Sequence, residues 1–186
     1  MMDRLGSEEL QTVLVLDGGV SAPTGGLVNG SNVRLIALDF SPRGTETPTE
    51  WGRRLGFEPS ELAVVTTDAR SVDSFDAEMI QQVRSPADLT GIGVEATKLL
   101  DTWGEETAAT PCVVLDSLTV LFQYAQLQPL YQFLHALTTR IANVGGYGIA
   151  FLDPMTQDQQ TVRSIASLFD ATAERTDGDD WQIRPR

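Results

Sequence analysis

The chain has 186 residues, of which 41% are hydrophobic and 21% are charged, and its formal net charge is −13. We expect a soluble protein with one domain over 1–186, of which residues 1–11 form a loose N-terminal lead-in. The acidity disfavours nucleic acid and anionic membranes as partners. No apolar run approaches the roughly 20 residues that a membrane helix needs. The polar start shows no signal peptide, so we expect a cytoplasmic protein.

Cysteine and lysine are almost absent. The single Cys112 excludes an intrachain disulfide and a cysteine-based zinc cluster, and we expect it to be a small buried residue. Lys98 is the only lysine, so twelve of the 13 basic residues are arginines. A dense acidic surface with almost no lysine is similar to the proteins of extreme halophiles, in which surface carboxylates keep a protein hydrated in molar salt. We therefore expect a haloarchaeal origin.

The chain begins with two apolar strands separated by a glycine-rich linker. The runs TVLVLD (12–17) and VRLIALDF (33–40) are short, continuous and rich in β-branched residues. Such runs are typical of strands that are buried on both faces of a parallel sheet. The linker at 18–32 holds five glycines and no lysine. We interpret it as a flexible loop, with an anion-binding nest as the alternative.

A third strand follows after a short helix. The helix is expected over 48–55, with a threonine before it as N-cap and a glycine after it as C-cap. The run LAVVTT at 62–67 is the third strand. The polar stretch at 68–86 is expected to be irregular, with a short helix at 75–80.

The middle of the chain alternates between helix and strand. Apolar residues recur at helical spacing over 87–104 and again over 128–144, where Gly145 and the next glycine end the pattern. Between these helices, PCVVLD at 111–116 is a buried strand, and a short helix is expected over 118–124.

The last part of the chain is expected to return to the sheet. YGIAFL (147–152) is a strand that the turn-forming Asp153-Pro154 pair ends, and 161–168 is a short helix. The runs 169–174 and 180–184 are expected to pair as a C-terminal β-hairpin around an Asp-Gly turn. This alternation predicts a three-layer α/β fold, with a mainly parallel central sheet and helices on both faces.

The carboxyl ends of the buried strands carry the candidate site. Asp116 ends the fourth strand with Ser117 after it, and Asp39 lies at the end of the second strand. Open α/β sheets bind ligands at this edge. The ordinary alternative is that these side chains cap turns at the ends of the strands.

The chain contains the four segments SPADLTGIGVEATKLLDTW, VVLDSLTVLFQY, LYQFLHALTTRI and FLDP…LFDATAE. Together they resemble the RecA/KaiC superfamily of P-loop ATPases, and more closely a haloarchaeal branch of uncharacterised KaiC-like proteins without the P-loop. The resemblance implies that Asp116 occupies the Walker B position, which serves Mg²⁺ in active members, with Ser117 following it. It places Asp39 near the position at which KaiC-like proteins carry a pair of catalytic glutamates, and this pair is not preserved in the present sequence.

The phosphate-binding part of such a site is missing from the sequence. A Walker A loop cradles phosphate on backbone N–H groups and a lysine, yet the linker after the first strand has no Gly-Lys-Ser/Thr motif. Its fifteen residues are also too few for a P-loop, a following helix of about 11 residues and a return loop. We therefore expect no ATP hydrolysis by the usual mechanism.

Two further features have a functional and an ordinary interpretation. His135 is the only histidine, and because no motif supplies a partner for a catalytic base, we expect it to be structural. A zinc site is not expected with one histidine and one cysteine. Several apolar residues could form a docking surface or belong to the protein's own core. These residues are Leu121, Phe122, Tyr124, Leu127 and Tyr131.

The sequence therefore predicts a non-catalytic RecA/KaiC-like domain that acts in regulation or scaffolding through contact with a protein partner or with copies of itself. The first alternative is a sensor that binds ATP with Mg²⁺ weakly at Asp116, Ser117 and Asp39, without hydrolysis. The second alternative is a small-molecule enzyme that reuses the same sheet edge. For the non-catalytic function we expect no cofactor and no catalytic residue.

Overall fold

The computed structural model describes residues 10–17, 32–40, 61–67, 80–106, 109–175 and 181–186. Its centre is an eight-stranded sheet in the order β4-β3-β2-β5-β6-β1-β7-β8. All neighbouring strands are parallel except β7 and β8, which form an antiparallel C-terminal hairpin. The strands are β1 (Thr12–Leu16), β2 (Val33–Asp39), β3 (Leu62–Thr66), β4 (Ile80–Gln82), β5 (Thr110–Asp116), β6 (Tyr147–Leu152), β7 (Ala171–Arg175) and β8 (Trp181–Pro185).

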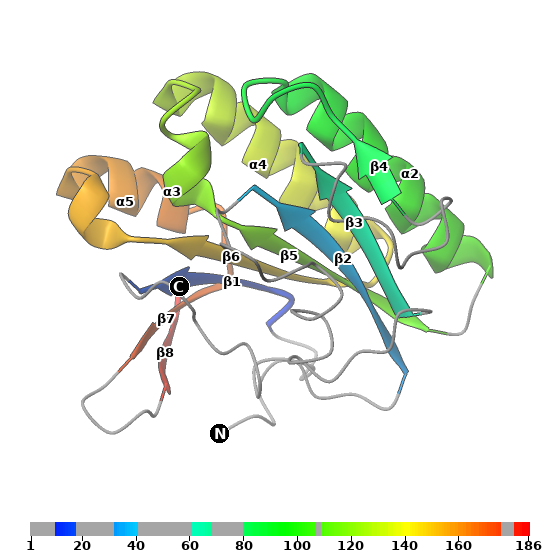
Figure 1. Ribbon diagram of the computed structural model, residues 1–186. Helices are drawn as coiled ribbons and strands as arrows, with labels where there is room; N and C mark the ends of the chain where they lie inside the picture. Colours follow the sequence, from blue (N-terminus) through cyan, green and yellow to red (C-terminus); the bar gives the residue numbers. More distant parts are fainter. Residues whose placement is uncertain (1–9, 18–31, 41–60, 68–79, 107–108, 176–180) are drawn as a thin grey trace.

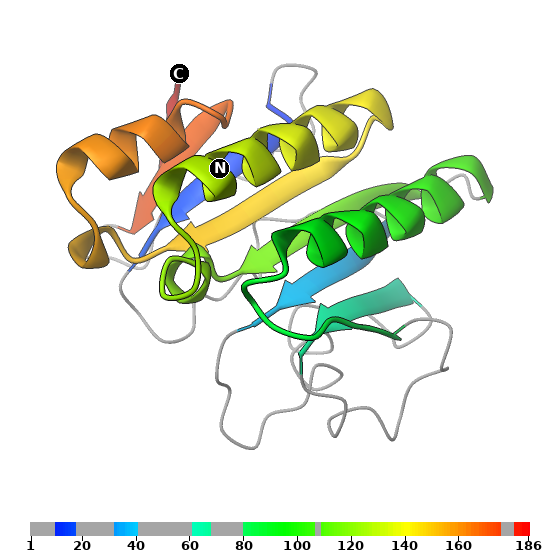
Figure 2. The ribbon, with the colours of Figure 1, turned by 90° about the horizontal axis from the view of Figure 1, so that it is seen from above.

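The described helices form a layer on one side of this sheet (Figure 1). Helix α2 packs on β2, β3 and β5, whereas α3 and α4 pack on β6 and α5 contacts α4. Seen from above, α2 and α4 run side by side along the strands (Figure 2). The helices are α2 (Leu89–Glu106), α3 (Leu118–Leu121), α4 (Leu127–Asn143), the 3-10 turn η5 (Pro154–Thr156) and α5 (Gln159–Ala166).

Strand residues alternate between two apolar cores, as the period of two in a β-strand requires. Residues such as Ile36, Leu38 and Leu115 face the helix layer and pack against α2 and α4. Their neighbours in sequence, including Leu35 and Val114, belong to a second cluster on the opposite face and are equally buried. Continuous apolar strands are therefore explained by burial on both faces.

The ends of α4 and α5 follow simple capping rules. Gly145 has a positive φ of 67° after the end of α4, and two backbone bonds, from Gly145 to Ala142 and from Gly146 to Ile141, close the helix. These two hydrogen bonds form a Schellman motif, which favours glycine at the left-handed position. At the other helix, Asp158 is the N-cap of α5 and accepts a hydrogen bond from the Thr161 N–H.

The predicted α/β class, the mainly parallel sheet and the C-terminal hairpin are confirmed. The prediction for the region before α2 is wrong in part, because Ile80 starts strand β4 at the sheet edge instead of ending a short helix. In the expected loose lead-in, Leu10 is buried and the Gln11 backbone is hydrogen-bonded to Asp170 and Gly148. The expected helix at 48–55, the glycine-rich linker from residue 18 to 31 and the hairpin turn lie outside the described residues.

Candidate functional site

The carboxyl edge of the central strands brings two of the predicted residues side by side. Strands β2 and β5 are parallel neighbours, and their register pairs Asp39 with Asp116. On its other side Asp39 pairs with Thr66 of β3. The backbone ladder continues past the strand end, because the Phe40 N–H donates to the Asp116 carbonyl oxygen at 2.8 Å. The two carboxylate-bearing residues therefore occupy one level of the sheet edge.

Strand periodicity places both aspartates on the face opposite the described helices. Leu38 and Leu115, the preceding residues, belong to the core under the helix layer, so the next residue along each strand faces the other way. Asp39 is buried and Asp116 is partly exposed. Both residues, and Ser117, interact with other groups of the protein. The geometry thus fits a structural role at the strand ends as well as a ligand-binding one.

Ser117 acts locally as a helix cap. Its Oγ accepts a long hydrogen bond of 3.4 Å from the Val120 N–H and forms the N-cap of the short helix α3. The peptide bond between Asp116 and Ser117 is cis. Of the three predicted site residues, Ser117 therefore has the clearest structural task.

Asp153 also takes the turn-forming role that its position predicts. Its carboxylate accepts a hydrogen bond from the Met155 N–H at 2.9 Å and caps η5. Its own N–H donates to Thr119 Oγ1 at 2.8 Å, which ties the end of β6 to α3. Across the described ranges, no three histidine, cysteine, aspartate or glutamate side chains lie close enough together to hold a metal ion.

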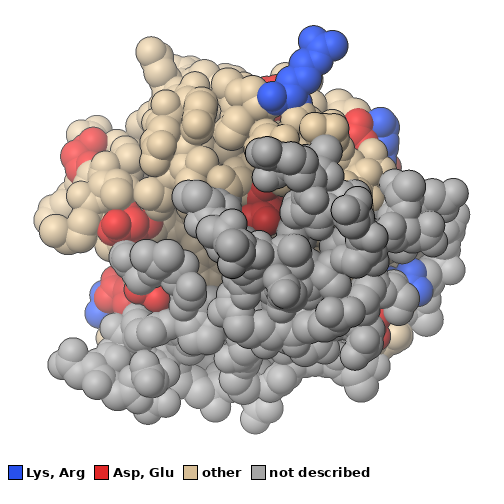
Figure 3. All heavy atoms as spheres, in the orientation of Figure 1, with Lys and Arg blue, Asp and Glu red and all other residues tan. Residues whose placement is uncertain are grey.

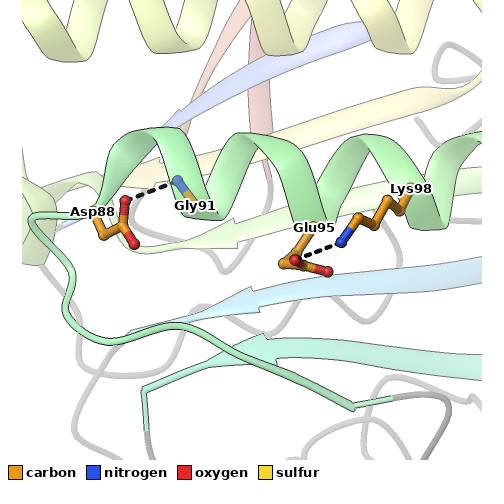
Figure 4. A network of polar contacts seen from close by, with 4 residues as sticks. All are labelled: Asp88, Gly91, Glu95 and Lys98. Atoms are coloured by element: carbon orange, nitrogen blue, oxygen red, sulfur yellow. Dashed lines mark hydrogen bonds and ion pairs between the residues drawn. The ribbon is translucent and has the colours of Figure 1, made fainter.

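The only lysine of the chain lies in the middle of helix α2, away from the start of that helix. Lys98 Nζ donates to Glu95 Oε1 at 2.8 Å, one turn away on the same helix, and the lysine side chain is 63% exposed (Figure 4). Near the beginning of α2, the Asp88 carboxylate accepts a hydrogen bond from the Gly91 N–H at 2.9 Å. Lys98 belongs to the helix surface, whereas a phosphate-cradling lysine belongs at the start of the helix that follows β1.

Helices α2 and α4 enclose an open groove on the outer side of the helix layer. Its volume is about 640 Å³, and it is lined by residues from successive turns of both helices. Val94, at its rim, is 48% exposed. The lining residues are Leu89, Thr90, Gly93, Val94, Thr97, Lys98 and Asp101 from α2, and Pro129, Gln132, Phe133, Ala136 and Leu137 from α4.

The predicted docking residues around α3 do not form one surface. Leu121 is fully buried and belongs to the core beneath the helices, so of its two alternatives the structure supports burial in the protein's own core. Phe122, Leu127 and Tyr131 are partly buried against the same core, and only Tyr124, at 54% exposure, lies open. Packing of α3 against β6 explains the burial, since it closes this end of the core.

Sequence reasoning missed a polar clamp at the opposite end of the sheet. The Asp170 Oδ2 atom accepts hydrogen bonds from the backbone N–H groups of Gln11 and Thr12, at 3.0 and 2.8 Å, and from Thr12 Oγ1 at 2.9 Å. In return, the Asp170 N–H donates to the Thr12 carbonyl oxygen. His135 is exposed on α4 and, with Asp170, lines a polar pocket of about 250 Å³. No local pattern signals this clamp, because its partners lie 158 residues apart.

A protein-family model matches residues 7–175 of the chain and is described as a family of unknown function, DUF7504. The chain belongs to the DUF7504 family. Comparison with curated proteins finds no significant relative. Within this DUF7504 chain, no described helix is both long and apolar enough to cross a membrane.

Solved structures show which fold this DUF7504 chain has. A KaiC-like protein of Pyrococcus horikoshii, PH0186, superposes with a TM-score of 0.54 at 13% identity, over 97% of this chain and 85% of that one. A second P. horikoshii protein, PH0321, solved in complex with an unknown peptide, gives 0.59 at 9% identity over 99% and 96%. A third, PH0250, gives 0.59 at 9% identity over 95% and 86%. The fold is therefore KaiC-like.

Proposed function

We propose that this chain is a non-catalytic RecA/KaiC-like domain that acts in regulation or scaffolding through contact with another protein. The observation that carries the proposal is the position of Lys98. The chain has no other lysine, and this one is paired with Glu95 on the surface of α2. Stabilising a transferring phosphoryl group requires positive charge held at the phosphates, so a lysine-cradled triphosphate does not fit these residues.

Two further observations support a role in protein contact. The helix layer carries the open groove between α2 and α4, and in the space-filling view its described surface is largely uncharged, with separate small acidic and basic patches (Figure 3). PH0321, which shares the fold at low identity, was crystallised with a peptide.

The net charge of −13 and the single lysine support assignment to a haloarchaeal branch without the Walker A motif.

The proposal is tested by measuring phosphate release from ATP with Mg²⁺ in molar KCl. We expect no release above the background of a buffer control, at protein concentrations where an active KaiC-like ATPase gives a clear signal. Phosphate release by the wild type that disappears in Asp116→Asn, with the melting temperature of the variant unchanged, would overturn the proposal, because loss of activity without loss of the fold indicates a working metal site.

A second candidate function is a nucleotide sensor without turnover. It is favoured by the register of β2 and β5, which sets Asp39 beside Asp116 at the edge where parallel sheets bind ligands. Such a sensor would bind ATP only with Mg²⁺, since carboxylates reach phosphate oxygens through the cation. Binding of Mg²⁺-ATP in equilibrium dialysis that Asp116→Asn abolishes would favour this candidate over the first.

A further inference from the structure

The groove between α2 and α4 has the length and shape to receive a helix. Its α2 wall runs from Leu89 to Asp101, about 18 Å at 1.5 Å per residue, and its α4 wall from Pro129 to Leu137, about 12 Å. Residues recur on each wall at intervals of three or four, so the groove follows both helix axes. A third helix of two to three turns matches this length.

Gly93 on the groove wall is not required by the packing of the chain itself. A Cβ at this position would lie 3.7 Å from the Phe133 ring, which is an ordinary contact. Gly91 differs, because a Cβ there would lie 2.4 Å from the Asp88 carboxylate. Glycine inside a helix costs about 1 kcal/mol relative to alanine. The missing side chain at Gly93 therefore leaves room for something outside the chain, such as a closely approaching backbone.

The charges at the groove are already neutralised within the chain. Lys98 is paired with Glu95, and Arg140 is paired with Asp101. The middle of the groove, around Gly93 and Phe133, has no charged side chain among its lining residues. The middle of the groove is thus an uncharged strip on a chain whose net charge is −13. An apolar surface can enter it without leaving an unpaired charge buried.

A second copy of this chain is a poor occupant. The groove is lined by twelve residues, whereas a stable interface between folded proteins takes about 20 to 30 residues on each side. Two copies would also bring charges of −13 together, and like charges repel during encounter. A single segment that carries positive charge meets neither obstacle, because it needs only a small contact area and its charge is opposite to the net charge of the chain.

We propose that the groove between α2 and α4 binds a basic amphipathic helix of a partner protein, with the apolar stripe of that helix against Val94, Gly93 and Phe133. This inference rests on the proposed function, because it names the surface and the partner class of that protein contact. Helix-in-groove recognition uses apolar anchors at i, i+3, i+4 and i+7. Basic residues outside the stripe would complement the net charge of −13 of the chain as a whole.

The test uses a fluorescent synthetic peptide of about 14 residues, four helical turns, with leucines at i, i+3, i+4 and i+7 and lysines elsewhere. A scrambled peptide of the same composition has the same charge without the stripe. Binding to the full chain is followed by fluorescence anisotropy at several KCl concentrations. Three variants are compared with wild type, namely Val94→Arg, Gly93→Ala and, as matched control, Met155→Arg. Met155 is 89% exposed and lies in η5, outside the groove lining.

We expect saturable binding of the striped peptide and at least tenfold weaker binding of the scrambled one. Val94→Arg should weaken binding roughly tenfold, whereas Met155→Arg, with the same change in charge, should leave it nearly unchanged. Gly93→Ala should weaken binding several-fold while raising the melting temperature, a combination that damage to the fold does not produce.

Equal binding of the two peptides would overturn the inference, because charge alone would then explain the attraction. So would an equal loss in Val94→Arg and Met155→Arg, the absence of saturable binding, or self-association by sedimentation that Val94→Arg abolishes, which would make a second copy the occupant. None of these results touches the phosphate-release measurement, so the inference and the proposed function fail separately.

Discussion

At the scale of single residues, Cys112 shows how burial controls chemistry. The side chain is fully buried in β5, and this desolvation raises the pKa of its thiol from 9.0 to about 12. The thiolate, which is the reactive form, is therefore suppressed in the folded protein at ordinary pH. We predict that Ellman's reagent finds no reactive thiol in the native protein at pH 8 and one thiol per chain in denaturant. Rapid labelling of the native protein would contradict this assignment.

The same pKa shift determines whether the free energy of unfolding rises or falls with pH. Well below pH 9 the thiol is protonated in both the folded and the unfolded state and contributes no dependence on pH. Between pH 9 and about 12 the unfolded chain loses this proton first, so the free energy of unfolding falls as pH rises. Cys112→Ala should remove this part of the alkaline slope, measured as the difference between the two unfolding curves. An unchanged difference across this range would contradict the shift.

Asp170 is the residue whose removal should affect the fold most clearly at the amino end of the sheet. Its carboxylate accepts three hydrogen bonds from Gln11 and Thr12, and an unsatisfied polar group costs about 1–3 kcal/mol when buried. We predict that Asp170→Ala lowers the free energy of unfolding by about 2 kcal/mol, measured by urea denaturation. Asp153→Ala, which removes a single exposed capping bond, is the control and should cost less.

At the scale of elements, the end of α4 depends on one backbone conformation. Gly145 has a φ of 67°, and a residue with a Cβ pays about 1–2 kcal/mol in this left-handed region. We predict that Gly145→Ala lowers the free energy of unfolding by about this amount. Gly104→Ala is the matched control with the opposite sign. A Cβ there, in the last turn of α2, would contact Val144 at an ordinary 3.5 Å, so helix propensity should stabilise the chain. Thermal melts of both variants that shift in the same direction would contradict the argument.

The elements also show which features were accessible from sequence. Continuous apolar runs such as β2 and β5 were predicted within a residue or two, because burial on both faces leaves a strong local signal. Strand β4 was missed because its three residues, Ile80–Gln82, are mostly polar and too short for a periodic pattern. The α2 and α4 stripes predicted two helices, but the open groove between them depends on their tertiary packing.

The candidate site divides in the same way. Strand ends placed Asp39 and Asp116 at one edge, yet their pairing in register is a contact between distant segments and needed the structure. The clamp formed by Asp170 could not be predicted for a similar reason, since its hydrogen-bond partner Thr12 lies 158 residues away in the sequence. Leu121 was left open between a surface and the core, because periodicity cannot tell which side of a short helix another element covers, and the structure places it in the core.

At the scale of the whole molecule, the net charge of −13 controls stability in solution. Like charges repel in the compact state, and salt screens them over a Debye length that falls from about 10 Å at 0.1 M to about 3 Å at 1 M. We predict that the melting temperature rises as KCl increases towards molar concentrations. A near-neutral protein of similar size serves as control for general salt effects. A flat or falling melting temperature would contradict the halophilic assignment.

The most direct test of the central claim is the melting temperature in molar KCl, with and without millimolar ATP and Mg²⁺, for wild type and Asp116→Asn. A ligand that binds only the folded state stabilises it by RT ln(1 + [L]/Kd), about 2.7 kcal/mol at a hundredfold excess over Kd. A non-catalytic domain that works through protein contact predicts no shift in either protein. A clear rise with wild type that is lost in Asp116→Asn would contradict the account and show that the edge of β5 still binds nucleotide.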